Sequence, residues 1–225
     1  MSTRIYLSDG IGFVEILETF GNDLTVVNAA RVSFDKMSVE LNDADKKLIR
    51  YLAKHNHTSP FFHPQVRFRI KMPIFVAREW FRHTIGFARN EVSRRYVDTP
   101  PECWIPPSDD IRERDPKLKQ GSKDTAINHS DDASQIILKQ TANAIASYNT
   151  LLSQGVAPEI ARTVLPQSMY TEFIETASLA AIARLCHLRL GKDAQKEIRT
   201  YANAVNDVML SHFPVSWDAL RATFT

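Results

Sequence analysis

The residues best suited to chemistry lie in one short run, Arg82-His-Thr-Ile-Gly-Phe-Ala-Arg-Asn-Glu-Val-Ser-Arg-Arg-Tyr96. The run holds four arginines, one histidine, one asparagine, one serine and a single acid. A solvated helix normally balances its charges more closely than this. Arginine forks match phosphate oxygens in bidentate pairs, and serine and asparagine add fixed hydrogen bonds. The run therefore suggests a binding site for a small, highly charged anion, and a basic surface loop is the alternative.

Two expected elements precede this run and must position it. Residues 65–72 alternate polar and apolar side chains without a break, which predicts a strand with one buried face. Pro73 suits the first turn of a following helix, which would deliver Arg78, Glu79 and Arg82 to the basic run. Glu79 lies three residues before Arg82 and could pair with it along that helix.

The other elements are expected on both sides of this unit. On the N-terminal side we expect a strand pair at 12–20 and 24–28 around a turn at 21–23, then a helix from Asn42 to about 55–57. On the C-terminal side we expect an irregular excursion over 98–129. A long helix from Ser130 should follow, with a buried apolar stripe of Ile137, Ala144, Ile145, Tyr148 and Leu152. After it we expect a short helical stretch that contains Arg162 and ends at Pro166, and then helices over 178–190 and 193–212.

Length and composition are those of an ordinary globular protein. With 225 residues, 44% of them hydrophobic, the chain can bury a substantial core, and we expect one domain over 1–225. A net charge of +2 is too small for general nucleic-acid binding. No segment approaches the roughly 18 consecutive apolar residues of a membrane span, and the N-terminus lacks an apolar secretory signal. We therefore expect no membrane contact and a cytoplasmic location.

No side chain is marked as a nucleophile. Cys103 and Cys186 lie far apart in no metal or redox spacing, which fits a reducing compartment. Neither has a basic partner that would activate a thiolate, so both are interpreted as packing residues. Ser93 has no histidine or lysine base spaced to activate it, and a phosphate-binding hydroxyl is its favoured role.

The order of residues in the basic run resembles the signature of the flavin-dependent thymidylate synthases. That family has arginine-histidine-arginine, a short spacer, then asparagine-glutamate-x-serine-x-arginine-tyrosine. This chain has Arg82-His83, then Asn90-Glu91-x-Ser93-x-Arg95-Tyr96. It departs from the family at Thr84, which replaces the second arginine, and in a spacer that is one residue longer and lacks the usual serine. Glu79 also stands where glutamine is common.

The resemblance continues through most of the chain. Ser33 matches it near the N-terminus, and so does the stretch from His57 to Phe61, although Phe62 stands where a glutamate is frequent. In the C-terminal half, Arg162-Thr-Val-Leu-Pro and Leu188-Arg189 match, followed by Ala194-Gln-x-Glu-Ile-Arg199; Ser178 and Ala180 replace the usual asparagine and arginine. By pattern alone, Arg189 is interpreted as an arginine whose stem covers the core. The matches on either side favour a functional role instead.

The resemblance implies a fold, a reaction and an assembly. The fold is α+β, an antiparallel sheet flanked by helices. The reaction is reductive methylation of dUMP to dTMP, with methylenetetrahydrofolate as carbon donor and FAD, reduced by NADPH, as hydride carrier. No protein nucleophile is needed, so the protein must orient flat ligands and stabilise charge on a pyrimidine. The family forms homotetramers whose active sites draw residues from several subunits.

The resemblance also implies roles for individual residues. Arg189 would stabilise negative charge on the uracil, the electrostatic contribution that is usually largest. The nucleotide would be bound by Glu79, Arg82, Glu91, Ser93, Arg94, Arg95 and Arg162. The flavin would be contacted by Ser33, His57, Ser59, Arg82, His83, Asn90, Glu91, Ser178 and Arg184.

Two other functions stay open. One is an FAD- or nucleotide-binding protein of the same fold that has lost catalysis, which the departures at Thr84, Phe62, Ser178 and Ala180 favour. The other is a metal-dependent nucleotide hydrolase built on acidic pairs, at 109–110 or 131–132. Adjacent carboxylates at such positions are usually solvated helix caps, which disfavours the hydrolase.

A metal site is not expected. His55, His57 and His63 lie close together in the sequence and could suggest zinc. No cysteine or carboxylate is spaced to complete a tetrahedral set, and a junction between helix and loop does not fix these side chains in metal geometry.

Overall fold

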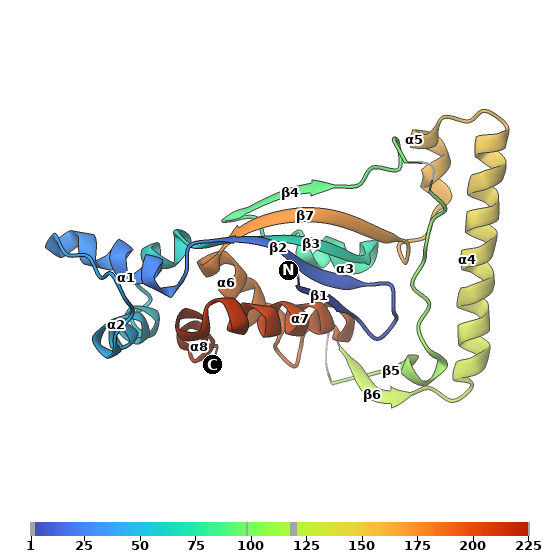
Figure 1. Cartoon of the computed structure of the whole chain (residues 1–225). Coiled ribbons are helices and arrows are strands. Elements are labelled where there is room, and N and C mark those ends of the chain that lie inside the picture. Colours follow the sequence, from blue (N-terminus) through green and yellow to red (C-terminus); the bar gives the residue numbers. More distant parts are fainter. Residues whose placement is uncertain (1–2, 98, 118–120, 225) are drawn as a thin grey trace.

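A computed structural model of the chain describes residues 3–97, 99–117 and 121–224. Five strands form one sheet at the centre of the molecule (Figure 1). The strands lie in the order β1-β2-β3-β7-β4, and every neighbouring pair is antiparallel. Their bounds are β1 Thr3–Tyr6, β2 Phe13–Phe20, β3 Gln65–Pro73, β4 Phe87–Glu91 and β7 Tyr170–Ser178. A separate hairpin pairs β5 Arg112–Arg114 with β6 Ser122–Ala126.

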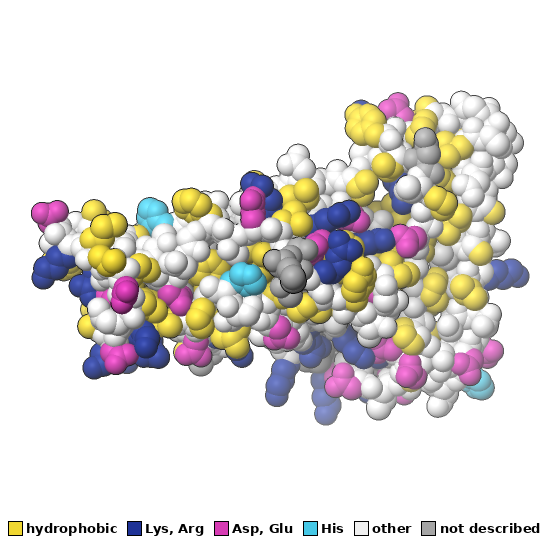
Figure 2. Space-filling view, in the orientation of Figure 1, with side chains coloured by type: hydrophobic (Ala, Val, Ile, Leu, Met, Phe, Trp, Pro, Cys, Tyr) yellow, Lys and Arg dark blue, Asp and Glu magenta, His cyan; other side chains and the backbone are white. Residues whose placement is uncertain are grey.

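β3 lies in the middle of the sheet and confirms the strand predicted over 65–72. Val66, Phe68 and Ile70 are buried, whereas Arg67 and Arg69 are exposed, as the alternation of a strand requires. The sheet therefore has one core face and one open face. Figure 2 shows basic and acidic side chains next to each other over the strands, in agreement with ion pairs between neighbouring strands.

Helices cover the core face. α6 Leu179–Arg189 and α7 Lys196–His212 pack beneath the strands, together with α3 Ile74–Trp80 and α8 Pro214–Arg221 (Figure 1). The space between holds fully buried side chains from all of these layers, including Phe68, Trp80, Leu185 and Trp217. The expected α+β architecture, an antiparallel sheet flanked by helices, is confirmed.

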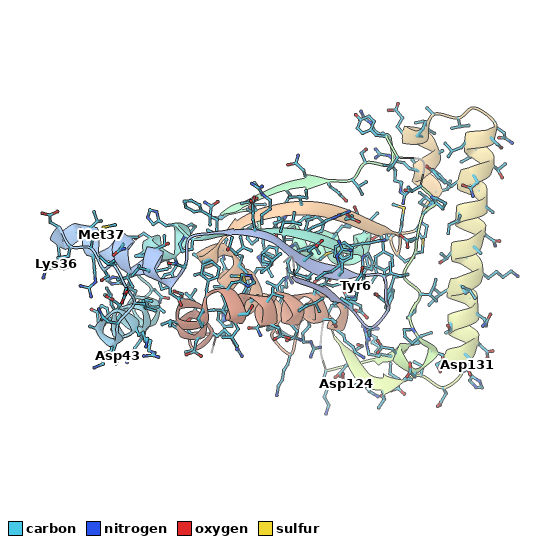
Figure 3. The ribbon with its side chains drawn as sticks, viewed as in Figure 1. Tyr6, Lys36, Met37, Asp43, Asp124 and Asp131 are labelled. Atoms are coloured by element: carbon cyan, nitrogen blue, oxygen red, sulfur yellow. The ribbon has the colours of Figure 1, made fainter. Side chains whose placement is uncertain are left out.

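The molecule is long because helices extend from both ends of the sheet. α1 Asp23–Arg31 and α2 Asp43–Lys54 lie at one end, and α4 Ser130–Ser153 with α5 Pro158–Ala161 lies at the other (Figure 1). Figure 3 shows Lys36 and Met37 at the tip of the first end and Asp131 at the start of α4. Short 3₁₀ turns are η1 Val32–Phe34, η2 Ser59–Phe62, η3 Ser108–Asp110 and η4 Arg162–Val164.

The second strand expected at 24–28 is wrong, because this segment is helix α1. Asn22 caps the helix: its side chain accepts hydrogen bonds from the backbone of Leu24 and Thr25, and the Thr25 hydroxyl accepts one from the Asn22 backbone N–H. Such a capping box supplies partners for backbone N–H groups that a helix start leaves open. The β-branched Val26 and Val27 pack into the core from a helix face.

The buried stripe expected on α4 is only partly confirmed. Tyr148 is buried, but Ile137, Ala144, Ile145 and Leu152 are only half-buried in this chain. The cause is visible in Figure 1, where α4 stands at the edge of the molecule, away from the sheet and its helices. Among the helices that the structure describes, none is long and apolar enough to cross a membrane.

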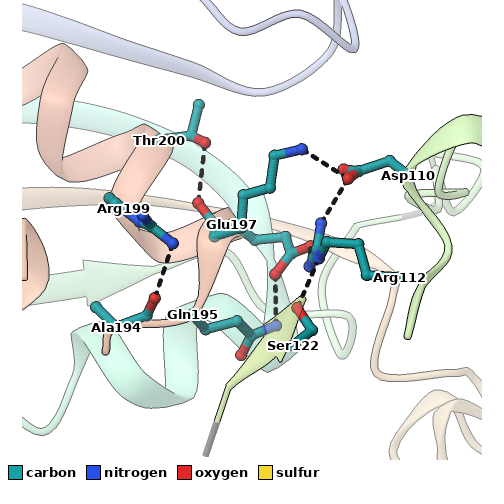
Figure 4. Close-up of polar contacts among 9 residues, drawn as sticks. Asp110, Arg112, Ser122, Ala194, Gln195, Glu197, Arg199 and Thr200 are labelled. Carbon is teal, nitrogen blue, oxygen red and sulfur yellow. Dashed lines mark hydrogen bonds and ion pairs between the residues drawn. The ribbon is translucent and has the colours of Figure 1, made fainter. Parts of the chain in front are cut away.

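The excursion expected over 98–129 is more ordered than predicted, apart from Asp98 and residues 118–120, which lie outside the described residues. It contains η3 and the β5–β6 hairpin, and Arg112 ties it to the start of α7 (Figure 4). The Arg112 guanidinium donates to Glu197 at 2.6 Å and to Asp110 at 2.7 Å. Asp110 also accepts from Lys196 at 2.6 Å, so this half of the proposed hydrolase acid pair is engaged in ion pairs.

Candidate active site

Arg189, the expected catalytic residue, meets two other predicted site residues at the end of α6. Its Nε donates to Nε2 of His83 at 3.0 Å, and its Nη2 donates to the backbone carbonyl of Glu79 at 3.2 Å. Its Nη1 lies 3.4 Å from the Glu79 carboxylate. We call these three residues the Arg189 cluster. α3 and the turn after it supply His83 and Glu79, and the three contacts fix the plane of the guanidinium.

Burial and neighbouring cations set the charge of this cluster. Burial of the His83 ring, together with the charges of Arg189, Arg89 and Arg184, lowers the pKa of His83 to about 4. The imidazole is therefore neutral at pH 7 and can accept the hydrogen bond from Arg189. Burial also raises the pKa of Glu79 above its ordinary value, against the opposing charge of Arg189.

We expect His83 to remain neutral well below the ordinary histidine range. In an NMR titration of the histidine rings, the His83 signals should reach half-protonation near pH 4, because protonation would break the hydrogen bond from Arg189 and add a cation beside three others. A midpoint near the ordinary value of 6.5 would show that His83 does not contact Arg189 in solution.

A second group of predicted residues lines a cavity of about 390 Å³ beside the end of β4. Glu91, Ser93 and Arg94 come from β4 and the turn after it, and Arg162 comes from η4. We call this space the Arg162 cavity. The Glu91 carboxylate accepts a hydrogen bond from the Thr171 hydroxyl at 2.5 Å, which fixes it on the wall. Two arginines and a serine around one hollow suit a phosphate.

A third group lies between α1, α2 and η2. Ser33, His57 and Ser59 line a cavity of about 580 Å³ with Arg31 and Tyr51, and we call this space the Ser33 cavity. It lies at the α1–α2 end of the molecule, whereas η4 and the Arg162 cavity lie toward the α4–α5 end (Figure 1). The predicted site residues are therefore not brought together in one place within a single chain.

Strand alternation separates two neighbouring predicted residues. In β4, Glu91 pairs with the buried Phe173, whereas Asn90 pairs with the exposed Ile174. Successive side chains of a strand point to opposite faces. The two side chains thus start toward opposite faces of the sheet, but β4 is an edge strand and both residues line a second cavity, of about 510 Å³, beside Arg94 and Glu172.

The remaining predicted residues have separate environments. Ser178 is buried and serves as the N-cap of α6, where its hydroxyl accepts from the Ala181 backbone at 3.3 Å. Arg82 and Arg184 are exposed, and they lie close in sequence to His83 and Arg189. Arg95 is exposed, and its guanidinium donates to the Tyr96 hydroxyl at 2.6 Å. Among the described residues, no group of three or more His, Cys, Asp or Glu side chains is arranged to bind a metal.

Comparison with known proteins identifies the family. The family model described as thymidylate synthase complementing protein matches residues 15–215. Flavin-dependent thymidylate synthases from Thermus thermophilus and Kosmotoga olearia are 38% and 40% identical, over 93% and 92% of this chain and 76% and 89% of theirs. This chain belongs to the flavin-dependent thymidylate synthases. A crystal structure of the UMP/dUMP methylase PolB from Streptomyces cacaoi, bound with 5-Br dUMP, has a TM-score of 0.84 at 29% identity and covers 93% of this chain and 94% of that one.

The sequence of this thymidylate synthase did not predict a role for Arg89, which contacts the predicted site residue His83. Arg89 lies in the lengthened spacer and forms an ion pair with the buried Glu175, which also accepts from the indole N–H of Trp80 at 3.2 Å. Arg89 Nη1 donates to the backbone carbonyl of His83 at 2.5 Å. The only sign of this pair in the sequence is Arg89 itself, within the basic run. Its partner Glu175 lies 86 positions away, so no local spacing connects the two residues.

Proposed function

We propose that this chain converts dUMP to dTMP, taking the carbon from methylenetetrahydrofolate and the hydride from FAD that NADPH has reduced. The observation that carries the proposal is the Arg189 cluster, a guanidinium held in place by a neutral imidazole and by Glu79. It occurs in a chain whose relatives are named flavin-dependent thymidylate synthases. The solved structures of PolB with brominated dUMP and UMP support a pyrimidine nucleotide as the ligand.

Arg189 would act by stabilising negative charge on the uracil ring. The guanidinium stays protonated at all accessible pH values, so it offers a fixed positive charge. Because His83 and Glu79 already hold it, little reorganisation is needed as charge develops on the substrate, and this preorganisation is the main source of such catalysis. Glu79 in the cluster and the exposed Arg82 would also contact the nucleotide.

The Arg162 cavity would hold the nucleotide phosphate. Arg94 and Arg162 both line it, and Ser93 adds a hydroxyl. Glu91 is kept on the wall by Thr171 and would orient the sugar rather than the phosphate. Arg95 extends the basic surface at the rim.

The flavin would be held by residues whose chemistry suits a diphosphate and a flat ring. These are Ser33, His57 and Ser59 in the Ser33 cavity, with Arg82, His83, Asn90, Glu91, Ser178 and Arg184 elsewhere. The Ser33 cavity is lined by two serine hydroxyls, the exposed ammonium of Lys36 and the ring of Tyr51, and these groups fit a diphosphate and a flat ring. When bound, FAD supplies the hydride.

A complete site would require several copies of the chain. The Ser33 cavity and the Arg162 cavity lie toward opposite ends of the molecule, so one ligand pair cannot reach both in one chain. Val32, Phe34, Met37 and Val39 are largely exposed beside the Ser33 cavity, which provides apolar surface for an interface. We propose a homotetramer with shared active sites. A monomeric variant that retained FAD would contradict this assembly.

The second candidate is a nucleotide- and flavin-binding protein without turnover. The observation that favours it is the commitment of Ser178 to capping α6, at a position where the family usually has asparagine. It predicts normal binding of FAD and dUMP with no conversion.

Tritium release from dUMP labelled at C5 separates the two candidates. With methylenetetrahydrofolate and NADPH present, we expect release that depends on added FAD. Protein that binds FAD, detected by its visible spectrum, and yet releases no tritium would support the binding protein instead. An Arg162→Ala variant is the matched test of the nucleotide cavity, and we expect its KM for dUMP to rise about tenfold, as for loss of one charge-assisted contact.

A further inference from the structure

Arg89 and Glu175 form a buried ion pair directly across β4 and β7. The two residues are register partners, and their side chains are 14% and 1% exposed. Glu175 accepts from both Arg89 and the Trp80 indole, and the Arg89 guanidinium lies over the ring of Phe87, 4.5 Å from its centroid. A buried ion pair is by itself weak evidence for stability, because removing two charges from water costs about as much as their attraction returns. A specific geometric role is therefore the better explanation of its presence.

The pair has a second connection that a purely structural ion pair would not need. Arg89 Nη1 donates to the backbone carbonyl of His83 at 2.5 Å. His83 lies in the turn between α3 and β4, and its imidazole is the acceptor for Arg189 Nε at 3.0 Å. One guanidinium thus bridges a buried carboxylate and the backbone of the residue that orients Arg189.

We propose that the Arg89–Glu175 pair is a positioning device that fixes the backbone of His83 and thereby holds Arg189 in place. Neither residue lines the Arg162 cavity or the Ser33 cavity; in this proposal they act through His83. The inference rests on the proposed function for its effect on turnover. It also accounts for the altered signature, because the lengthened spacer that contains Arg89 provides a support for the turn in which Thr84 replaces an arginine.

The fork of the arginine is the required feature. A lysine carries the same charge but offers one compact ammonium, which cannot match the planar, bidentate reach of a guanidinium. If only charge neutralisation of Glu175 mattered, lysine would serve. If the position of His83 matters, lysine fails although the charge is retained.

The test compares a charge-free double variant with a matched control. Arg89→Met with Glu175→Gln removes both charges and leaves Trp80 an amide oxygen to bond. The control, Arg67→Met with Glu18→Gln, removes an exposed ion pair from the open face of the same sheet. Arg89→Lys serves as a second variant that keeps the charge.

The first measurement is the tautomer of the His83 ring, from long-range proton–nitrogen NMR spectra of the protein without ligands. In the wild type, the bond from Arg189 leaves Nε2 unprotonated and places the proton on Nδ1. We expect the double variant and Arg89→Lys to lose this single tautomer, and the control to keep it. A retained Nδ1–H tautomer in both variants would overturn the inference whatever the enzyme's activity.

The second measurement is turnover. We expect kcat of the double variant to fall about 10- to 100-fold, as misplacement of catalytic groups typically does. KM for dUMP should change less than about twofold, because the Arg162 cavity is left intact. An unchanged kcat with a lost tautomer would also overturn the proposed role. A wild type without turnover would instead defeat the proposed function, and the tautomer comparison would still decide the inference.

Discussion

Replacement of Arg189 by lysine is expected to reduce kcat about 10²- to 10³-fold, the loss typical of removing one preorganised donor from a site where charge develops. Lysine keeps a positive charge on the same helix, but its single ammonium cannot bond His83, the Glu79 carbonyl and the Glu79 carboxylate together. The charge would then be mobile, and part of its stabilising effect would be spent on reorganisation when the substrate ring becomes negative.

The measurement is steady-state tritium release, with unfolding midpoints to show that the variant is folded. Arg221→Lys on α8 is the matched control, because Arg221 is exposed and lies on a different helix from Arg189. Arg189→Lys should leave binding of FAD nearly unchanged. A variant with more than a third of wild-type kcat would show that the Arg189 cluster is not where charge is stabilised, and another cation would have to be sought.

The elements that could be predicted from sequence are those whose pattern is local. The alternation from Val66 to Met72 and the capping side chain of Asn42 each contain their own signal. β4 lacked such a signal, since it is an edge strand made of Phe-Ala-Arg-Asn-Glu, in which polar side chains occupy both faces. In β7, the buried Glu175 interrupts the apolar face that would have marked the strand. Its burial makes sense only with Arg89 and Trp80 beside it.

The same distinction applies to the site. Residue types and their order identified the family and the residues of its signature, because those are properties of the chain. Which residues share a pocket is a property of the fold. His83 and Arg189 are 106 positions apart and in contact, and Ser93 and Arg162 come from different elements and line one cavity. No local pattern could have joined either pair.

Removal of the Asp45 side chain is expected to lower the free energy of unfolding strongly. Asp45 is fully buried at the start of α2 and accepts hydrogen bonds from Arg31 at 2.9 Å, the Ser38 hydroxyl at 3.1 Å and the Asn42 backbone at 3.2 Å. It therefore joins α1, α2 and the segment between them that carries Ser33. Asp45→Ala leaves the partly buried Arg31 without its partner, and breaking a buried pair in this way costs about 3 kcal/mol.

The pH dependence identifies the cause of that loss. Burial acts to raise the pKa of Asp45, but the hydrogen bonds from Arg31, the Asn42 backbone and Ser38 outweigh it and lower the pKa below the ordinary 3.8. A carboxylate with a lowered folded-state pKa stabilises the protein fully above the unfolded pKa, and this contribution disappears as the pH falls through the folded value. Urea unfolding of wild type and Asp45→Ala, at one protein concentration, should differ at pH 7 and converge below pH 4.

Asp43→Ala provides the matched control two residues earlier on the same helix. Its carboxylate is 89% exposed and pairs with Lys46 at 3.1 Å, so its loss should cost less than about 0.5 kcal/mol. If Asp45→Ala is destabilised equally at pH 7 and pH 3, the lost packing volume and not the ionised carboxylate is what stabilises this end of the molecule. If instead the difference vanishes in acid, the charge of Asp45 organises the wall of the Ser33 cavity, and FAD affinity should fall together with stability.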